Sequence, residues 1–152
     1  MTALRKVTYL SEQEYLAAEL TANVRHEYID GQIYAMAGAS ENHNRIAGNV
    51  FFQLRAAARG GHCGVFMSDM KLKVAWQKAY YYPDVLLVCN RQDDGEYFKQ
   101  QPCLIAEVLS PSTNKTDRRE KLWAYQKIPS LRYYLLVSAS RENVEYFVRN
   151  SQ

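Results

Sequence analysis

The sequence predicts an α/β fold of the α+β kind, in which helices flank a mixed β-sheet. From residue 41 onward, segments whose apolar residues recur every three or four positions are followed by shorter segments that alternate or are continuously apolar. The resulting order of helix, strands, helix and strand favours a mixed sheet over a doubly wound parallel one. With 152 residues, 47% of them hydrophobic and 23% charged, we expect residues 1–152 to form a single domain with a sizeable core.

Composition argues against some classes of protein. No apolar run approaches the roughly 18 residues of a transmembrane helix, and no signal-peptide pattern opens the chain, so we expect a cytoplasmic protein without membrane contact. A net charge of +3 permits nucleic-acid binding but does not by itself indicate it. Cys63, Cys89 and Cys103 are odd in number and widely spaced, so we expect reduced core cysteines, with neither a disulfide nor a zinc site.

Local signals place the first elements. The Ser-x-x-Glu pattern at residues 11–14 is a capping box, which predicts a short helix that runs to about Leu20. The dipeptide Asp30-Gly31 supplies the positive φ angles of a tight turn, and it therefore predicts a hairpin between strands at 26–29 and 32–36.

The remaining elements follow from apolar periodicity and helix-ending residues. Ser40 is positioned to cap a second helix, and Gly60-Gly61 is positioned to end it. A third helix is expected from Asp117 through Gln126, because Pro129 halts it. Strands are expected at 70–76, with its even-numbered residues buried, and at 84–89, 103–109, 131–137 and 143–148.

Two carboxylates stand where apolar strands should exclude them. Glu107 interrupts the strand at 103–109, which is apolar on both faces, and Asp84 opens the preceding apolar strand. Burying an unpaired ionised carboxylate costs several kcal/mol, so each needs a cation, a metal ion or a proton. If the two strands are neighbours, about 4.8 Å apart, both carboxylates can point into one notch at the end of the sheet.

Two interpretations of this pair remain open from periodicity alone. Two hard oxygen ligands suit Mg²⁺ or Mn²⁺, which would fill its other positions with water and substrate phosphate. Alternatively, Asp84 caps a turn after Pro83, and Glu107 forms a salt bridge with an arginine or lysine from a helix.

Motifs along nearly the whole chain resemble those of one protein family. They are Pro83-Asp84, Ala106-Glu107-Val108-Leu109-Ser110-Pro111-Ser112-Thr113, Asp117-Arg118-Arg119-Glu120-Lys121-Leu122-Trp123-Ala124-Tyr125, Arg25-His26-Glu27-Tyr28-Ile29-Asp30-Gly31, and Met36-Ala37-Gly38-Ala39-Ser40 with His43. In this the chain resembles the Uma-two family of bacterial restriction-endonuclease-like proteins, within the PD-(D/E)XK nuclease superfamily. The resemblance implies a restriction-endonuclease-like core, DNA as substrate, and Mg²⁺ or Mn²⁺ bound by Asp84 and Glu107.

One departure from the superfamily concerns its water-activating lysine. That lysine would fall two residues after Glu107, where this chain has Leu109. Lys121, which matches the family pattern D-x-x-x-K-x-x-x-Y, is our first candidate for the catalytic cation, and Lys73 is the second; the alternative for either is a solvated surface charge. Further candidate catalytic residues are Glu27 and His43, which could complete the acidic cluster or hold the first helix in place.

Other segments yield weaker hypotheses about partners. Residues 110–116, followed by Arg118 and Arg119, could hold the phosphates that flank a cut. Residues 80–82 are three tyrosines that could stack on unpaired bases or simply pack on neighbours. Relatives usually continue beyond the closing hairpin, whereas this chain stops at Gln152. An apolar sheet edge left uncovered in this way could be closed in a homodimer. The alternative to an endonuclease is a catalytically inactive nucleic-acid-binding or dimeric interaction module that keeps the nuclease fold.

Overall fold

The computed structural model of the protein describes residues 8–111 and 117–150, and it gives only the backbone for residues 117 and 118. In chain order the elements are α1 (Glu12–Glu19), β1 (His26–Ile29), β2 (Gln32–Ala35), α2 (Glu41–Ala57), β3 (Gly64–Met67), β4 (Lys71–Val74), the 3₁₀ turn η1 (Ala75–Gln77), β5 (Ala79–Tyr81), β6 (Val85–Val88), β7 (Phe98–Lys99), β8 (Leu104–Leu109), the π-helical turn η2 (Asp117–Lys121), α4 (Leu122–Tyr125), β9 (Tyr133–Ser138) and β10 (Val144–Val148).

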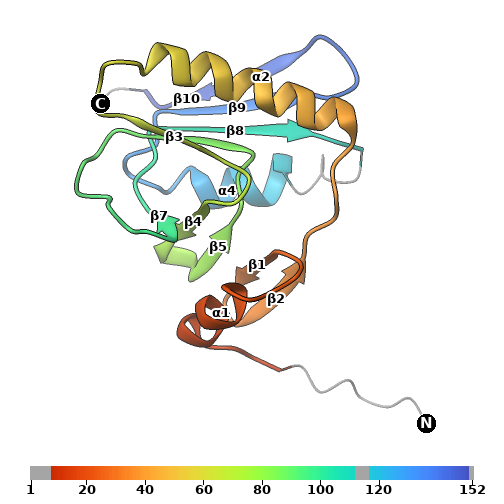
Figure 1. The fold of residues 1–152 in the computed structure, drawn as a ribbon, viewed down its shortest axis with the longest axis vertical. Coiled ribbons are helices and arrows are strands. Elements are labelled where there is room, and N and C mark those ends of the chain that lie inside the picture. The colour runs from red at the N-terminus through yellow and green to blue at the C-terminus, as the bar shows by residue number, and fades with distance from the viewer. Residues whose placement is uncertain (1–7, 112–116, 151–152) are drawn as a thin grey trace.

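Within the described residues these strands form two five-stranded sheets rather than one. The first has the order β2-β1-β5-β4-β7, and the second has the order β10-β9-β8-β6-β3. Figure 1 shows the two sheets one above the other, with α1 and the β1–β2 hairpin at the end of the molecule remote from α2. The predicted α+β class is therefore confirmed, and the single mixed sheet is replaced by two.

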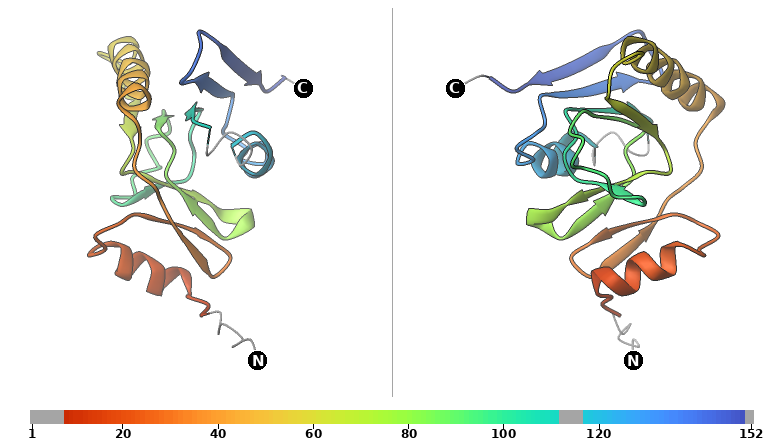
Figure 2. Two further views of the ribbon diagram at one scale, coloured as in Figure 1. Left: turned by 90° about the vertical axis from the view of Figure 1, so that its right-hand side faces the viewer. Right: turned by 60° about the vertical axis from the view of Figure 1, so that its left-hand side comes forward.

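Helices cover both faces of the second sheet. Helix α2 packs on β3, β6 and β8, and α4 lies on the opposite face, as the left view of Figure 2 shows. The buried core between α4 and the two sheets includes Leu72 and Tyr81 from the first sheet and Ile105 and Tyr134 from the second. Strand β8 runs antiparallel to β6 and parallel to β9, so the sheet is mixed and η2 and α4 lie on the crossover between β8 and β9.

Most of the local predictions are confirmed. Ser11 and Glu14 form the predicted capping box at the start of α1, and Ser40 caps α2 through the N–H of His43. Asp30 and Gly31 have φ angles of 43° and 97°, which are the positive values that the predicted hairpin turn requires. These features depend only on residues close together in the sequence, and this is why they could be predicted.

The strand predicted at 70–76 is wrong in its length and in one buried face. Strand β4 ends at Val74, and Trp76 lies in η1 with 40% of its surface exposed. Lys71, expected on the polar face, is buried, and its ammonium group lies 5.5 Å from the centre of the Tyr82 ring. Packing against the ring of Tyr82, the residue after β5, outweighs the two-residue pattern here.

The prediction of three reduced cysteines is also wrong. Cys63 and Cys89 form a disulfide, and the thiol of Cys103 is free. The antiparallel register of β3 and β6 pairs Gly64 with Val88, so the cysteines that flank this pair, one position beyond it, lie side by side. Cys63 and Cys89 are 26 residues apart in the sequence, and this spacing does not reveal the strand register that brings them together.

No helix within the described residues is long and apolar enough to cross a membrane.

Candidate active site

The two predicted carboxylates face each other across neighbouring strands. The antiparallel register of β6 and β8 pairs Val85 with Ala106, and the positions one step further along are Asp84 and Glu107. The backbone N–H of Asp84 donates to Oε2 of Glu107 at 3.3 Å, and the N–H of Val108 donates to Oδ2 of Asp84 at 2.7 Å. Each carboxylate is thus held by the backbone of the other strand, which fixes both at the end of the ladder.

Glu107 is buried and is held by two residues of the crossover helix. Lys121 Nζ lies 3.4 Å from Glu107 Oε1, and the hydroxyl of Tyr125 donates to the same oxygen at 3.2 Å. Lys121 closes the π-helical turn η2 and Tyr125 ends α4, so a spacing of four residues puts both side chains on one helix face. Tyr125 is not among the predicted site residues, although its K-x-x-x-Y spacing from Lys121 is a signal in the sequence.

Lys121 also connects Glu107 to the first sheet. Its Nζ lies 3.5 Å from Oε1 of Glu27, a residue of β1. The N–H of Tyr82 is directed at the same oxygen of Glu27 at 3.5 Å. One buried ammonium group therefore pairs with carboxylates from two different sheets, and Glu27 joins the cluster as the sequence suggested.

His43 approaches Asp84 from helix α2. Its Nε2 lies 3.3 Å from Asp84 Oδ2, and the backbone of His43 is fixed by the cap from Ser40. Burial by itself raises the pKa of Asp84, but the hydrogen bonds from His43 and from the N–H of Val108 outweigh burial and hold the pKa below its ordinary value. Asp84 is therefore ionised at neutral pH.

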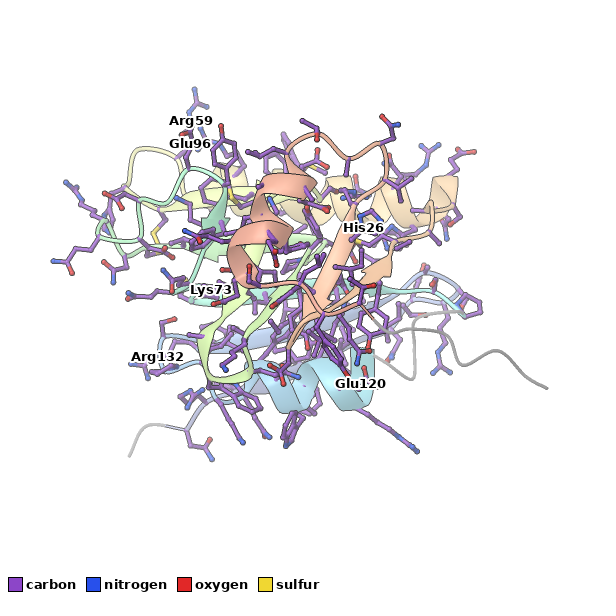
Figure 3. The ribbon with its side chains drawn as sticks, turned by 90° about the horizontal axis from the view of Figure 1, so that it is seen from below. His26, Arg59, Lys73, Glu96, Glu120 and Arg132 are labelled. Atoms are coloured by element: carbon purple, nitrogen blue, oxygen red, sulfur yellow. A yellow bond between two sulfur atoms is a disulfide. The ribbon has the colours of Figure 1, made fainter. Side chains whose placement is uncertain are left out.

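Lys73, the second candidate for the catalytic cation, lies elsewhere. Its Nζ is 3.5 Å from Oε1 of Glu12 in α1, and it lies over the rings of Tyr80 and Phe98. In Figure 3, Lys73 and Glu120, the residue before Lys121, are well apart. Of the six predicted site residues, the structure brings together Asp84, Glu107, Lys121, Glu27 and His43, and it leaves Lys73 outside the cluster.

Leu109 and the tyrosines at 80–82 are core residues. Leu109, at the position of the superfamily lysine, packs in the core between α4 and the sheets. Tyr80, Tyr81 and Tyr82 are each at most 4% exposed, so packing, and not stacking on bases, accounts for them. Residues 112–116 and the side chain of Arg118, predicted to hold phosphates, lie outside the described residues; Arg119 is exposed.

The donor atoms of the cluster fit a small divalent cation. Asp84 and Glu107 offer carboxylate oxygens on adjacent strands; the side chain of Asp84 is 20% exposed and can be reached from solvent, whereas that of Glu107 is 3% exposed. Across the described residues, no group of three or more His, Cys, Asp or Glu side chains is arranged to hold a metal ion. A cation here would take two protein ligands and complete its shell with water and phosphate oxygens, as Mg²⁺ commonly does.

Comparisons with known proteins agree on the class of fold and then on the family. A crystal structure from Anabaena variabilis ATCC 29413, titled a "putative nuclease belonging to DUF820", superimposes with a TM-score of 0.68 at 14% identity and covers 92% of this chain and 85% of its own. The fold is thus restriction-endonuclease-like. The family model described as "Uma2: Putative restriction endonuclease" matches residues 12–152, and the chain belongs to this family, the Uma-two family of the sequence analysis.

Two cyanobacterial relatives are similar over most of their length. The uncharacterized protein slr1290 of Synechocystis sp. is 39% identical over 142 residues, which is 93% of this chain and 75% of slr1290. The uncharacterized protein sll1609 of the same organism is 35% identical over 150 residues, which is 97% of this chain and 85% of sll1609.

Proposed function

We propose that the chain is a metal-dependent endonuclease that hydrolyses phosphodiester bonds in DNA, with Mg²⁺ or Mn²⁺ held by Asp84 and Glu107. The observation that carries the proposal is the pairing of these two carboxylates across β6 and β8 with a buried lysine beside them. Membership in a family described as a putative restriction endonuclease supports the same reaction. When bound, the metal ion would supply an activated water and positive charge at the phosphate under attack.

Lys121 is our choice for the catalytic cation that replaces the superfamily lysine. A lysine at position 109 would share a strand face with Glu107, but that position is filled by the buried Leu109. Lys121 reaches the same carboxylate from the helix instead, with its Nζ 3.4 Å from Glu107 Oε1. There it can orient the attacking water and balance negative charge, and Glu27 and Tyr125 act as positioning residues for the Lys121–Glu107 pair.

His43 supports Asp84 in this mechanism. With a proton on Nε2, its ring donates a hydrogen bond to Asp84 Oδ2 across 3.3 Å. This contact favours the ionised form of Asp84 and restrains the rotamer of its side chain. His43 is thus a positioning residue for the metal ligand.

A hollow beyond the end of β8 suits the backbone of the DNA strand. It has a volume of about 320 Å³ and lies at the end of β8, two residues beyond Glu107. Its polar lining consists of Ser110, Ser138, Ser140, Arg141 and Asn143. Hydroxyl, amide and guanidinium groups are the side chains that contact phosphate oxygens in protein–DNA complexes, and they carry no base specificity.

Nicking of supercoiled plasmid tests the proposal. Purified protein should relax the plasmid in Mg²⁺ or Mn²⁺ and not in chelator, and Asp84→Ala and Glu107→Ala should each lose this activity. We expect a loss of about 100-fold or more, since metal-ion charge stabilisation is worth several kcal/mol and each 1.4 kcal/mol is a factor of ten. Asp94→Asn, in an exposed loop, is the control for removal of one carboxylate.

Titration calorimetry with Mn²⁺ separates the nuclease from the inactive binding module. Saturable Mn²⁺ binding that disappears in folded Asp84→Ala supports the metal site. In the nicking assay, cleavage that persists equally in Asp84→Ala and Glu107→Ala identifies a contaminating nuclease. DNA binding with neither cleavage nor saturable Mn²⁺ binding would overturn the proposal in favour of the binding module.

A further inference from the structure

Three cysteines lie side by side across three neighbouring strands, at the end of β6 and β8 away from the acidic cluster. Cys63 precedes β3, Cys89 follows β6, and Cys103 precedes β8. The register pairs Gly64 with Val88 on one side of β6 and Leu87 with Leu104 on the other. Cys89, on the central strand, therefore lies opposite Cys63, whereas Cys103 lies opposite Val88, one position short of Cys89.

The free thiol is held against the disulfide. Cys63 and Cys89 are joined, and the Sγ atom of Cys103 lies 3.6 Å from the Sγ atom of Cys89. The backbone of Cys103 is fixed at both polar groups, because its N–H donates to Leu87 O at 2.9 Å and its carbonyl accepts from the N–H of Arg132 at 2.9 Å. The thiol is thus in contact with the sulfur that thiol–disulfide exchange requires it to attack.

We propose that Cys63, Cys89 and Cys103 form a thiol–disulfide exchange site, in which Cys89 pairs alternately with Cys63 and with Cys103. In the forward step the Cys103 thiol loses its proton, and the thiolate attacks Cys89 Sγ. The bond between Cys103 and Cys89 forms while the bond between Cys89 and Cys63 breaks, and Cys63 leaves as a thiolate that takes up a proton. One disulfide and one thiol are present before and after, so the step needs no oxidant or reductant.

The two disulfides join different parts of the sheet. The Cys63–Cys89 bond ties β6 to β3, whereas a Cys89–Cys103 bond would tie β6 to β8, the strand that carries Glu107. All three cysteines are partly exposed, so small reagents can reach the site. Because the site lies at the far end of these strands from Asp84 and Glu107, the inference does not depend on nuclease activity.

Alkylation of the native, oxidised protein tests the inference. The full chain is incubated with iodoacetamide without reductant, and the labelled cysteines are identified by peptide mass spectrometry. A cysteine in a disulfide cannot be alkylated, so label on Cys63 requires that Cys103 has displaced it. We expect label on both Cys63 and Cys103 in the wild type, and no label on Cys63 in Cys103→Ser, where the attacking thiol is absent.

Reoxidation of a second variant, Cys63→Ser, tests the inference independently of alkylation. Reduced Cys63→Ser, reoxidised with oxidised glutathione, should form the Cys89–Cys103 disulfide, just as Cys103→Ser should form Cys63–Cys89 under the same conditions. The inference is overturned if the wild type is labelled only on Cys103, or if Cys63→Ser stays reduced while Cys103→Ser oxidises. Circular dichroism of each variant confirms that the comparison is made on folded protein.

Discussion

The two ends of the hydrogen-bonded β6–β8 strand pair carry different kinds of side chain. At one end, Asp84 and Glu107 face each other within a group of charged side chains; at the other, Cys89 and Cys103 are in contact beside a disulfide. The acidic end is completed by residues from β1, α2, η2 and α4, whereas the cysteine end needs only β3. Burying charge requires partners from many elements, while the contacts among the cysteines involve only three neighbouring strands.

The largest effect on stability is expected when the acidic end loses its lysine. Lys121→Met leaves Glu27 and Glu107 without their shared buried cation, and breaking a buried ion pair costs about 3–5 kcal/mol. Urea unfolding measures this loss, and adding Glu107→Gln to the variant should recover part of it.

Lys73→Met is the matched control for that variant. The partly exposed Lys73–Glu12 pair should be worth about 0–1 kcal/mol, and plasmid nicking should be retained in Lys73→Met but lost in Lys121→Met. Equal unfolding free energies for the two lysine variants would show that the buried cluster has no special dependence on Lys121.

The next largest effect is expected at the cysteine end. Cys89→Ser removes the sulfur shared by both disulfides, and closing a loop of this length stabilises a protein by about 3 kcal/mol. Cys103→Ser retains the Cys63–Cys89 bond and should stay within about 0.5 kcal/mol of the wild type. Unfolding is compared with and without reductant, and the gap between the two variants should close when reductant is added. A gap that persists in reductant would assign the loss to packing instead of the disulfide.

A smaller effect is expected from the hydroxyl that contacts Glu107. Tyr125→Phe removes a hydrogen bond to a buried carboxylate, which should cost about 1.5–3 kcal/mol. If Tyr125 positions Glu107, nicking activity should fall about tenfold as well.

Tyr81→Phe is the control for that substitution, because its hydroxyl bonds to the neutral side chain of Gln77 within the same core. It should cost about 1 kcal/mol and leave nicking unchanged. An equal fall in activity for both tyrosine variants would mean that the loss reflects general destabilisation.

The smallest effect is a change in how stability depends on pH. The pKa of Asp84 is lower in the folded protein than its ordinary value of about 4, so ionised Asp84 stabilises the fold above that value. The contribution is lost as the pH falls through the lower folded pKa. The difference in unfolding free energy between wild type and Asp84→Asn, measured by urea titration, should therefore shrink as the pH falls below about 4. A difference that grows on acidification would contradict the direction of the shift.

Sequence patterns succeeded where neighbouring residues set the structure. The caps at Ser11 and Ser40 and the turn at Asp30-Gly31 each depend on a few adjacent side chains, and all three are present. A short sequence pattern also singled out Asp84 and Glu107, because burying a carboxylate without a partner costs free energy in any fold.

Patterns failed where the outcome depended on contacts between distant segments. Lys71 is buried beside the ring of Tyr82, and Cys63 and Cys89 are joined because β3 and β6 pair in one register. The family pattern ranked Lys121 above Lys73 as the candidate cation, but only the position of the crossover helix puts Lys121 beside Glu107 and leaves Lys73 beside Glu12.

The sequence by itself determined that one carboxylate within an apolar strand and one at the start of another would need partners, because the cost of burying an unpaired charge does not depend on the fold. Tertiary structure alone decided which partners they have. It brought Lys121, Tyr125, Glu27 and His43 to one end of β6 and β8 and three cysteines to the other, because strand register and helix packing fix which distant residues come within a few ångströms.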